Sequence, residues 1–194
     1  KPYTVVFYNL ENLFDIYDDP ETHDEEFTPD GAKQWNEIKY QKKLSNMERV
    51  LFDIAAIQKD YPIVIGVSEI ENRTVLEDLI SQPKLKGANY RICHYDSPDA
   101  RGVDVAFLYR ADVFKLEGSD NIKLVVEELP DFRTRDLVTM WACGVTFNFA
   151  ANSSCVNFIA TLRFFIVVPI SIHNTILRYL VAIQHGFILS LKNK

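Results

Sequence analysis

The acidic residues of this chain stop abruptly at Asp136. All 27 Asp and Glu residues of the 194-residue sequence lie in residues 1–136, where 17 Lys and Arg leave a net charge of −10. The remaining 58 residues hold four basic residues and no acid. A soluble domain rarely keeps one third of its surface free of carboxylates. We therefore expect two parts that follow different rules, residues 1–141 and an atypical apolar continuation over residues 142–194.

The composition of the whole chain is that of a globular protein. Hydrophobic residues make up 47% and charged residues 25%, while seven Gly and eight Pro exclude collagen-like and linker sequences. A net charge of −6 argues against a nonspecific polyanion binder, but it does not exclude an enzyme that brings metal ions to a phosphate. The spacing of Cys93, Cys143 and Cys155 matches neither a zinc site nor a disulfide framework, so we expect small buried apolar side chains.

The hydrophobic periodicity of residues 1–136 predicts strands that alternate with helices and then a run of strands. The expected strands cover residues 3–9, 62–67, 90–95, 103–109 and 112–116, and the expected helices cover 35–58 and 73–81. The long helix is expected to carry its basic residues on the face opposite its apolar ones, namely Lys39, Lys42, Lys43 and Arg49. This order of elements favours a layered α/β or α+β sandwich.

Polar side chains follow the first two expected strands at the point where each strand ends. Asn9 and Glu11 follow the first, and they share one face if the extended conformation lasts that far. Glu69 follows the second, and ligands of such sheets usually bind at the carboxyl ends of strands. Carboxylate and amide oxygens suit Mg²⁺ or Mn²⁺, which keep waters and take further ligands from a substrate phosphate. The alternative is that these residues form turns or are merely solvated.

A turn-rich segment over residues 96–102 carries the next candidates. Arg101 has the planar fork that grips a phosphate, and Asp104 is placed to orient it, unless both serve the turn alone. His94 precedes this turn, and we interpret it as a half-buried strand residue rather than a catalyst. Arg133 and Arg135 also invite a phosphate-binding interpretation, although alternate basic residues on an exposed strand are often only solvated.

Four segments in order resemble the endonuclease/exonuclease/phosphatase superfamily, and the similarity is greatest to its secreted bacterial members. They read FYNLENLFD at 7–15, IGVSEIENR at 65–73, DSPDARGVDVAFLY at 96–109 and FRTRD at 132–136. The resemblance covers roughly residues 3–141 and implies a layered α/β sandwich of that type, with its second half incomplete or replaced.

The same resemblance implies a function and roles for three residues. Members of this superfamily cleave phosphoester bonds with Mg²⁺ or a similar ion. By resemblance, Glu69 is a metal ligand, Asn9 lies beside the metal and the substrate phosphate, and Glu11 stands where many members carry an acid near the metal. The expected substrate is a phosphate ester, including nucleic acid as one class, with no obligate protein partner. An exported bacterial protein, periplasmic or extracellular, is the compartment that the family suggests.

Two patterns of the superfamily's second half do not occur in this sequence. One is an Asp-x-Asn segment that positions the attacking water, and the other is an Asp-His pair that completes the acid and base chemistry. No acid follows Asp136, and neither His173 nor His185 has an acidic neighbour in sequence. We therefore expect a phosphoesterase with impaired activity. The alternative is a noncatalytic remnant or binding module on the same scaffold.

The apolar continuation leaves several interpretations open. Segments 155–172 and 176–191 are compatible with strands, core helices or weak membrane helices. Arg163 lies near the middle of the first segment, and a central Arg costs roughly 2.5 kcal/mol or more on membrane insertion, so we do not expect a membrane span. A frameshifted continuation after Trp141 is a further interpretation of this acid-free composition.

Overall fold

The computed structural model describes the chain from residue 3 to 123 and from 133 to 141 with its side chains, and beyond that point only the course of several strands. The described residues form two helices, two short 3₁₀ turns and eleven strands. They are β1 (Val5–Leu13), η1 (Glu25–Phe27), α1 (Glu37–Gln58), β2 (Val64–Ile70), α2 (Arg73–Ile80), η2 (Lys86–Ala88), β3 (Tyr90–His94), β4 (Asp104–Arg110), β5 (Leu116–Ile122), β6 (Leu137–Ala151), β7 (Ser154–Ile166), β8 (Ser171–Ile172), β9 (Thr175–Ile176), β10 (Val181–Ile183) and β11 (Phe187–Leu189).

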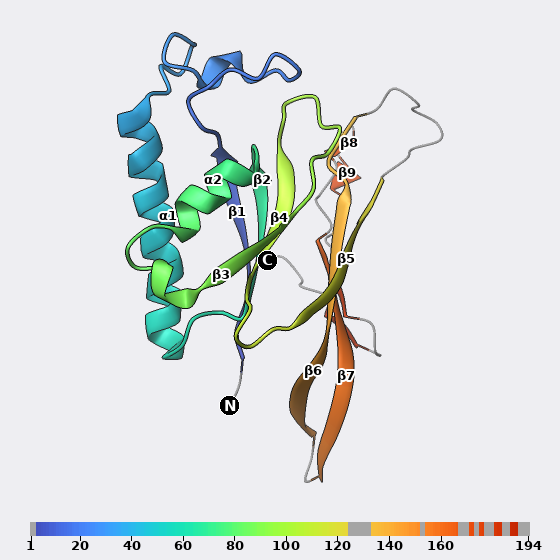
Figure 1. Cartoon of the computed structure of the whole chain (residues 1–194). Coiled ribbons are helices and arrows are strands. Elements are labelled where there is room, and N and C mark those ends of the chain that lie inside the picture. The colour runs from blue at the N-terminus through green and yellow to red at the C-terminus, as the bar shows by residue number, and fades with distance from the viewer. Residues whose placement is uncertain are drawn as a thin grey trace.

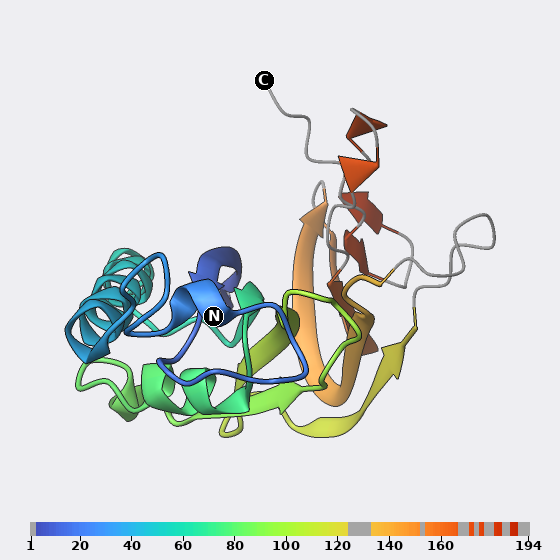
Figure 2. The ribbon, with the colours of Figure 1, turned by 90° about the horizontal axis from the view of Figure 1, so that it is seen from above.

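A four-stranded sheet in the order β1-β2-β4-β3 forms the centre of the molecule. β1 and β2 run parallel, whereas β4 runs antiparallel to both of its neighbours, β2 and β3. Both α1 and α2 cover one face of this sheet, and the sheet β5-β6-β7 lies on the side of the other face (Figures 1 and 2). The predicted layered α/β architecture is confirmed.

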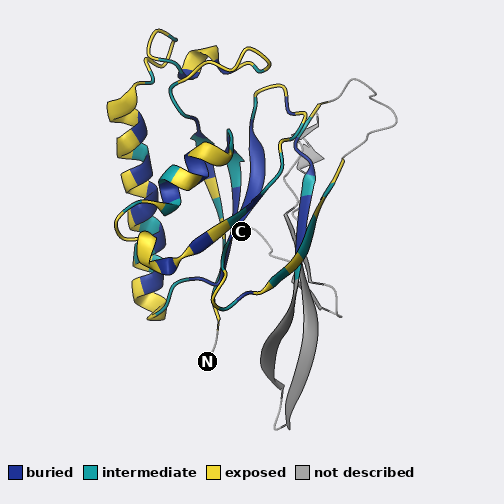
Figure 3. Cartoon of the chain, viewed as in Figure 1, coloured by how far each residue is buried: buried dark blue, intermediate teal, exposed yellow. Residues whose placement is uncertain are grey.

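Alternation along the central strands produces two separate cores. In β2 and β4, Ile65 and Leu108 pack toward the helices, whereas Val64 and Phe107 belong to the cluster that includes Val138 of β6. Side chains on successive strand residues point to opposite faces, so a continuous apolar run is what a sheet buried on both faces requires. Figure 3 shows this burial along β4 and on the inner side of α1.

Local backbone and side-chain interactions define both ends of α1. Asn36 caps its first turn by accepting a hydrogen bond from the backbone N–H of Lys39 at 3.2 Å. Leu44 and Leu51, both fully buried, lie on the stripe that packs on the sheet. The helix ends at Lys59, whose left-handed backbone (φ 57°) closes the last turn three residues before Pro62.

The structure corrects the expected strand over residues 112–116. Residues 111–113 form a turn, in which the backbone N–H groups of Val113 and Phe114 both donate to the carbonyl of Arg110. The Arg110 guanidinium binds Asp112 and Asp60 at 2.6 and 2.8 Å and holds this reversal. Because the backbone is committed to the turn, the next strand, β5, starts only at Leu116.

The apolar continuation forms strands wherever the structure describes it. β6 runs from Leu137 through Trp141 to Ala151 and pairs with β7 in an antiparallel ladder. Among the described residues, no helix has the length and apolar character needed to cross a membrane. Cys93 is free and buried, as expected, whereas the side chains of Cys143, Cys155, Arg163, Arg178, His173 and His185 lie outside the described part.

Candidate functional site

The four strands of the central sheet bring the candidate residues to one edge. In the parallel β1-β2 pair, Asn9 lies opposite Ser68, the residue before Glu69. In the antiparallel pair, Asp104 at the start of β4 lies opposite Ile70 at the end of β2. Since neighbouring strands are about 4.8 Å apart and successive Cα atoms 3.8 Å apart, the Cα atoms of Asn9 and Glu69 lie within about 9 Å of each other.

Both strand ends at this edge are irregular. Asn9 and Glu11 would share one face of β1 if the strand stayed regularly extended as far as Glu11. It does not, because Glu11 and Asn12 have positive φ angles of 52° and 62°. Glu69 is also left-handed, with φ 60°, at the irregularity between Ser68 and Ile70. Such backbone is costly for residues other than Gly and concentrates at functional sites, where bulges redirect side chains.

Local hydrogen bonds hold the end of β1 in this shape. The Oδ1 atom of Asn9 accepts the backbone N–H of Glu11 at 2.7 Å. The Lys43 ammonium of α1 donates to the carbonyls of Glu11 and Asn12, the latter at 2.9 Å. Lys43 was expected on the solvent face of the helix, and nothing in the helical periodicity distinguishes it from Lys42. The position of the Lys43 side chain is set by its tertiary contact with the end of β1.

The Lys43 ammonium links the two strand ends electrostatically. Burial lowers the pKa of Lys43, while the carboxylates of Glu11 and Glu69 raise it. Lys43 therefore lies within electrostatic reach of both acids.

Arg135 is the most unusual group at this edge. Its side chain is only 8% exposed, and its Nη1 atom lies 3.7 Å from Oε1 of Glu69. Within the described part of the chain, its Nε and Nη1 atoms make no hydrogen bond. Burial and the neighbouring Arg101 lower the pKa of Arg135, whereas Asp99 and Glu69 raise it. A buried guanidinium with free donors is suited to an anion that reaches this edge.

Arg101 does not have the partner that the sequence suggested. Its Nε and Nη2 atoms donate to the two carboxylate oxygens of Asp99, each at 3.1 Å, and this pairing raises the pKa of Arg101. Asp99, two residues earlier in the same turn, is the group that sequence reasoning missed. Asp104 instead accepts from His94 Nε2 and from the Ser97 backbone, each at 2.9 Å, because His94 stands at the end of the neighbouring strand.

The remaining candidates separate by burial. Arg133 is exposed and lines a pocket of about 430 Å³, whereas Arg135 is buried, so the two arginines do not act as one solvated pair. His94 is a strand residue whose side chain is only 4% exposed.

The donor set at the β1 and β2 ends suits a hard cation. Glu69 and Glu11 supply carboxylate oxygens, and Asn9 Oδ1 keeps a second lone pair beside the one bound by Glu11. Neither acid belongs to a tight group of three ligand side chains in the described part of the chain.

Comparison with known proteins gives the family. The sequence model described as the endonuclease/exonuclease/phosphatase family matches residues 4–154. The chain therefore belongs to this family, and the match continues beyond Trp141, where we expected the resemblance to end. A search of curated protein sequences found no match.

Three solved structures are similar to the chain at low identity. A family protein from Bacteroides thetaiotaomicron is 15% identical with a TM-score of 0.41, over 84% of this chain and 49% of that one. Its counterpart from Bacteroides vulgatus is 14% identical with a TM-score of 0.36, over 71% and 44%. ANGEL2, described as a 2',3'-cyclic phosphatase, is 15% identical with a TM-score of 0.35, over 52% and 26%. The chain thus spans less than half the length of these structures.

Proposed function

We propose that this chain is a metal-dependent phosphoesterase domain that acts on phosphodiesters or phosphomonoesters, with nucleic acid as one substrate class. The observation that carries the proposal is the sheet edge where Glu69 stands beside Arg135, a buried guanidinium with free hydrogen-bond donors. A carboxylate for a cation and a guanidinium for an anion are together what a metal-bound phosphate needs.

Each residue at this edge has a proposed role. Glu69, Glu11 and Asn9 would hold Mg²⁺ or Mn²⁺, which when bound polarises a phosphoryl oxygen. Arg135 and Arg101 would hold the phosphate oxygens, with Asp99 fixing the fork of Arg101. Lys43 would position the end of β1 through the carbonyls of Glu11 and Asn12. The periplasmic or extracellular location that the family resemblance implies belongs to the same proposal.

The deciding experiment measures hydrolysis of bis(p-nitrophenyl) phosphate with and without Mg²⁺. We expect the Mg²⁺-dependent rate to fall at least about 10²-fold in Glu69→Ala and Glu69→Gln, because a carboxylate ligand is lost. Glu117→Gln makes the same chemical change at an exposed position of β5 and serves as the matched control.

A noncatalytic role on the same scaffold is the second candidate, because residues 137–194 contain neither the Asp-x-Asn nor the Asp-His pattern of the family. Equal background hydrolysis in the wild-type chain and both Glu69 variants would favour this alternative. Retained binding of inorganic phosphate, lost in Arg135→Met, would then identify a phosphate-binding module.

A further inference from the structure

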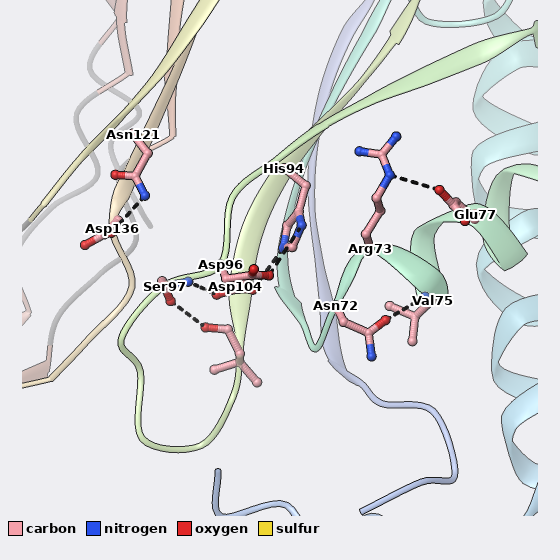
Figure 4. A network of polar contacts seen from close by, with 11 residues as sticks. Asn72, Arg73, Val75, Glu77, His94, Asp96, Ser97, Asp104, Asn121 and Asp136 are labelled. Atoms are coloured by element: carbon pink, nitrogen blue, oxygen red, sulfur yellow. Dashed lines mark hydrogen bonds and ion pairs between the residues drawn. The ribbon is translucent and has the colours of Figure 1, made fainter. Parts of the chain in front are cut away.

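Three side chains outside the proposed Mg²⁺ site form a compact ligand group. His94 at the end of β3, Asp96 in the following turn and Asp104 at the start of β4 each offer one ligand atom, and these atoms lie within 4.8 Å of one another. Among the described residues, this is the one group of three such side chains whose ligand atoms lie this close together. Figure 4 shows the three side chains converging between the two strands.

One separation within this group has the spacing of adjacent ligands on one ion. Nε2 of His94 and Oδ2 of Asp104 lie 2.9 Å apart, and Nδ1 of His94 lies 3.9 Å from Oδ1 of Asp96. Two ligands that bind one ion at about 2.1 Å and at right angles lie about 3.0 Å apart. Nε2 of His94 and Oδ2 of Asp104 therefore have the spacing of adjacent ligands. Asp96 faces the other ring nitrogen, Nδ1, and its side chain, 94% exposed, is free to turn toward the ion at Nε2.

The surroundings supply the two further conditions for an ion site. His94 and Asp104 are held by burial, with side chains only 4% and 5% exposed, and Ser97 N–H fixes the second oxygen of Asp104. Asp96 and Asp104 both line the pocket of about 430 Å³, which gives an entry path and room for water ligands.

That pocket is strongly acidic. Six acidic side chains line it against the single guanidinium of Arg133, and they belong to Asp19, Glu21, Glu71, Asp96, Asp99 and Asp104. Burial raises the pKa of Glu71 to about 8, so this one is mostly protonated at neutral pH. A cleft lined by one sign of charge concentrates ions of the opposite sign.

We propose that His94, Asp96 and Asp104 form a second metal site, selective for a divalent transition-metal ion such as Zn²⁺. An imidazole with two carboxylates favours such an ion over Mg²⁺, which prefers oxygen ligands alone. The ion replaces the hydrogen bond between His94 and Asp104, and the imidazole binds as its neutral form with the proton on the other ring nitrogen. It joins the end of β3 to the start of β4 and so fixes the turn that carries Asp99 and Arg101.

The test titrates the full chain, freed of metal by chelation, with Zn²⁺ against a chromophoric chelator. Co²⁺ is used in parallel, because its visible absorption reports nitrogen and oxygen coordination. Asp96→Asn is the main variant, since an exposed side chain is not needed for folding, and His94→Gln is the second. Asp53→Asn is the matched control, an exposed Asp on α1.

We expect a saturable Zn²⁺ site that is weakened at least about tenfold by Asp96→Asn and by His94→Gln. The site should be unchanged in Asp53→Asn and also in Glu69→Gln, which separates it from the proposed Mg²⁺ site. Zn²⁺ affinity and Co²⁺ absorption equal to wild type in Asp96→Asn would overturn the proposal. So would the absence of any saturable Zn²⁺ binding, which would leave His94 and Asp104 as a structural hydrogen bond.

Discussion

At the scale of single residues, Arg135 combines an expected cost in stability with its proposed role in phosphate binding. A buried charge without full hydrogen bonding destabilises the fold. Its partner Glu69, 3.7 Å away, keeps 21% of its side chain exposed, so solvent can compensate Glu69 when Arg135 is replaced by an apolar residue. We expect Arg135→Met to keep or raise the melting temperature while phosphodiester hydrolysis falls about 10²-fold or more, since a preorganised donor to developing charge is lost. Thermal denaturation and kinetics on the same preparation measure both. A large loss of stability would show that Arg135 is structural.

Glu71 offers a prediction about pH at the same scale. Burial, reinforced by the charges of Asp15, Asp24 and Asp19, raises the pKa of Glu71 to about 8 despite the backbone N–H of Asp15 that it accepts. In the unfolded chain, the pKa of the Glu71 carboxyl is about 4.5. The folded state therefore binds more protons between these values, and this residue lowers stability progressively as pH rises from about 4.5 to 8.

Glu71→Gln should remove that dependence, because the amide oxygen still accepts from Asp15 and carries no charge. The variant should match the wild type near pH 4 and exceed it at pH 9. Each kcal/mol corresponds to roughly 2–4 °C in melting temperature for a domain of this size. Glu25→Gln, at an exposed position, is the matched control and should show no such divergence. Parallel stability curves for Glu71→Gln and wild type across this range would contradict the prediction.

At the scale of secondary-structure elements, both helices begin with an Asn N-cap, but the N-cap of α2 also contacts a segment outside its helix. Asn36 and Asn72 each accept the N–H three residues ahead, at 3.2 and 3.1 Å. Asn72 also donates a hydrogen bond outside its helix, from its Nδ2 atom to Oδ2 of Asp15 at 3.1 Å, in the segment after β1. The start of α2 is therefore tied to the segment that follows β1.

We expect Asn36→Ala to cost about 1 kcal/mol, the usual loss for an N-cap. Asn72→Ala should cost about 1 kcal/mol more, because it also leaves Asp15 without this donor. Denaturant titration of both variants measures the difference. Equal losses would mean that the contact between Asn72 and Asp15 contributes nothing to stability.

At the scale of the whole molecule, we expect the acid-free composition of residues 137–194 to limit catalysis. Residues 137–194 contain no carboxylate that could position or activate water, and each missing general acid or base typically costs 10²- to 10⁴-fold in rate. We expect this chain to hydrolyse phosphodiesters far more slowly than family members that carry the Asp-x-Asn and Asp-His patterns. Steady-state kinetics with Mg²⁺ check this, and a turnover near the enzyme median of about 10 s⁻¹ would contradict it.

The sequence by itself determined the elements of the first sheet. Strands β1, β2, β3 and β4 and both helices overlap the ranges that periodicity predicts, because apolar spacing directly reflects which side chains are buried. β1 and β2 run on to Leu13 and Ile70, past the expected ends at residues 9 and 67. It also directed attention to Asn9, Glu11 and Glu69, since polar residues that follow apolar runs mark strand ends. The strand expected at 112–116 failed because the contacts of Arg110 with Asp60 and Asp112 are not visible in a local pattern.

Only the tertiary structure decided which groups meet at the sheet edge. The distance between residues 43 and 11, or 135 and 69, is set by how helix and strands pack, and no period in the sequence encodes it. The structure therefore supplied Lys43, the free donors of Arg135 and the pairing of Arg101 with Asp99. It also separated Asp104 from Arg101 and placed it against His94, because strand register, rather than closeness along the chain, determines which side chains face each other.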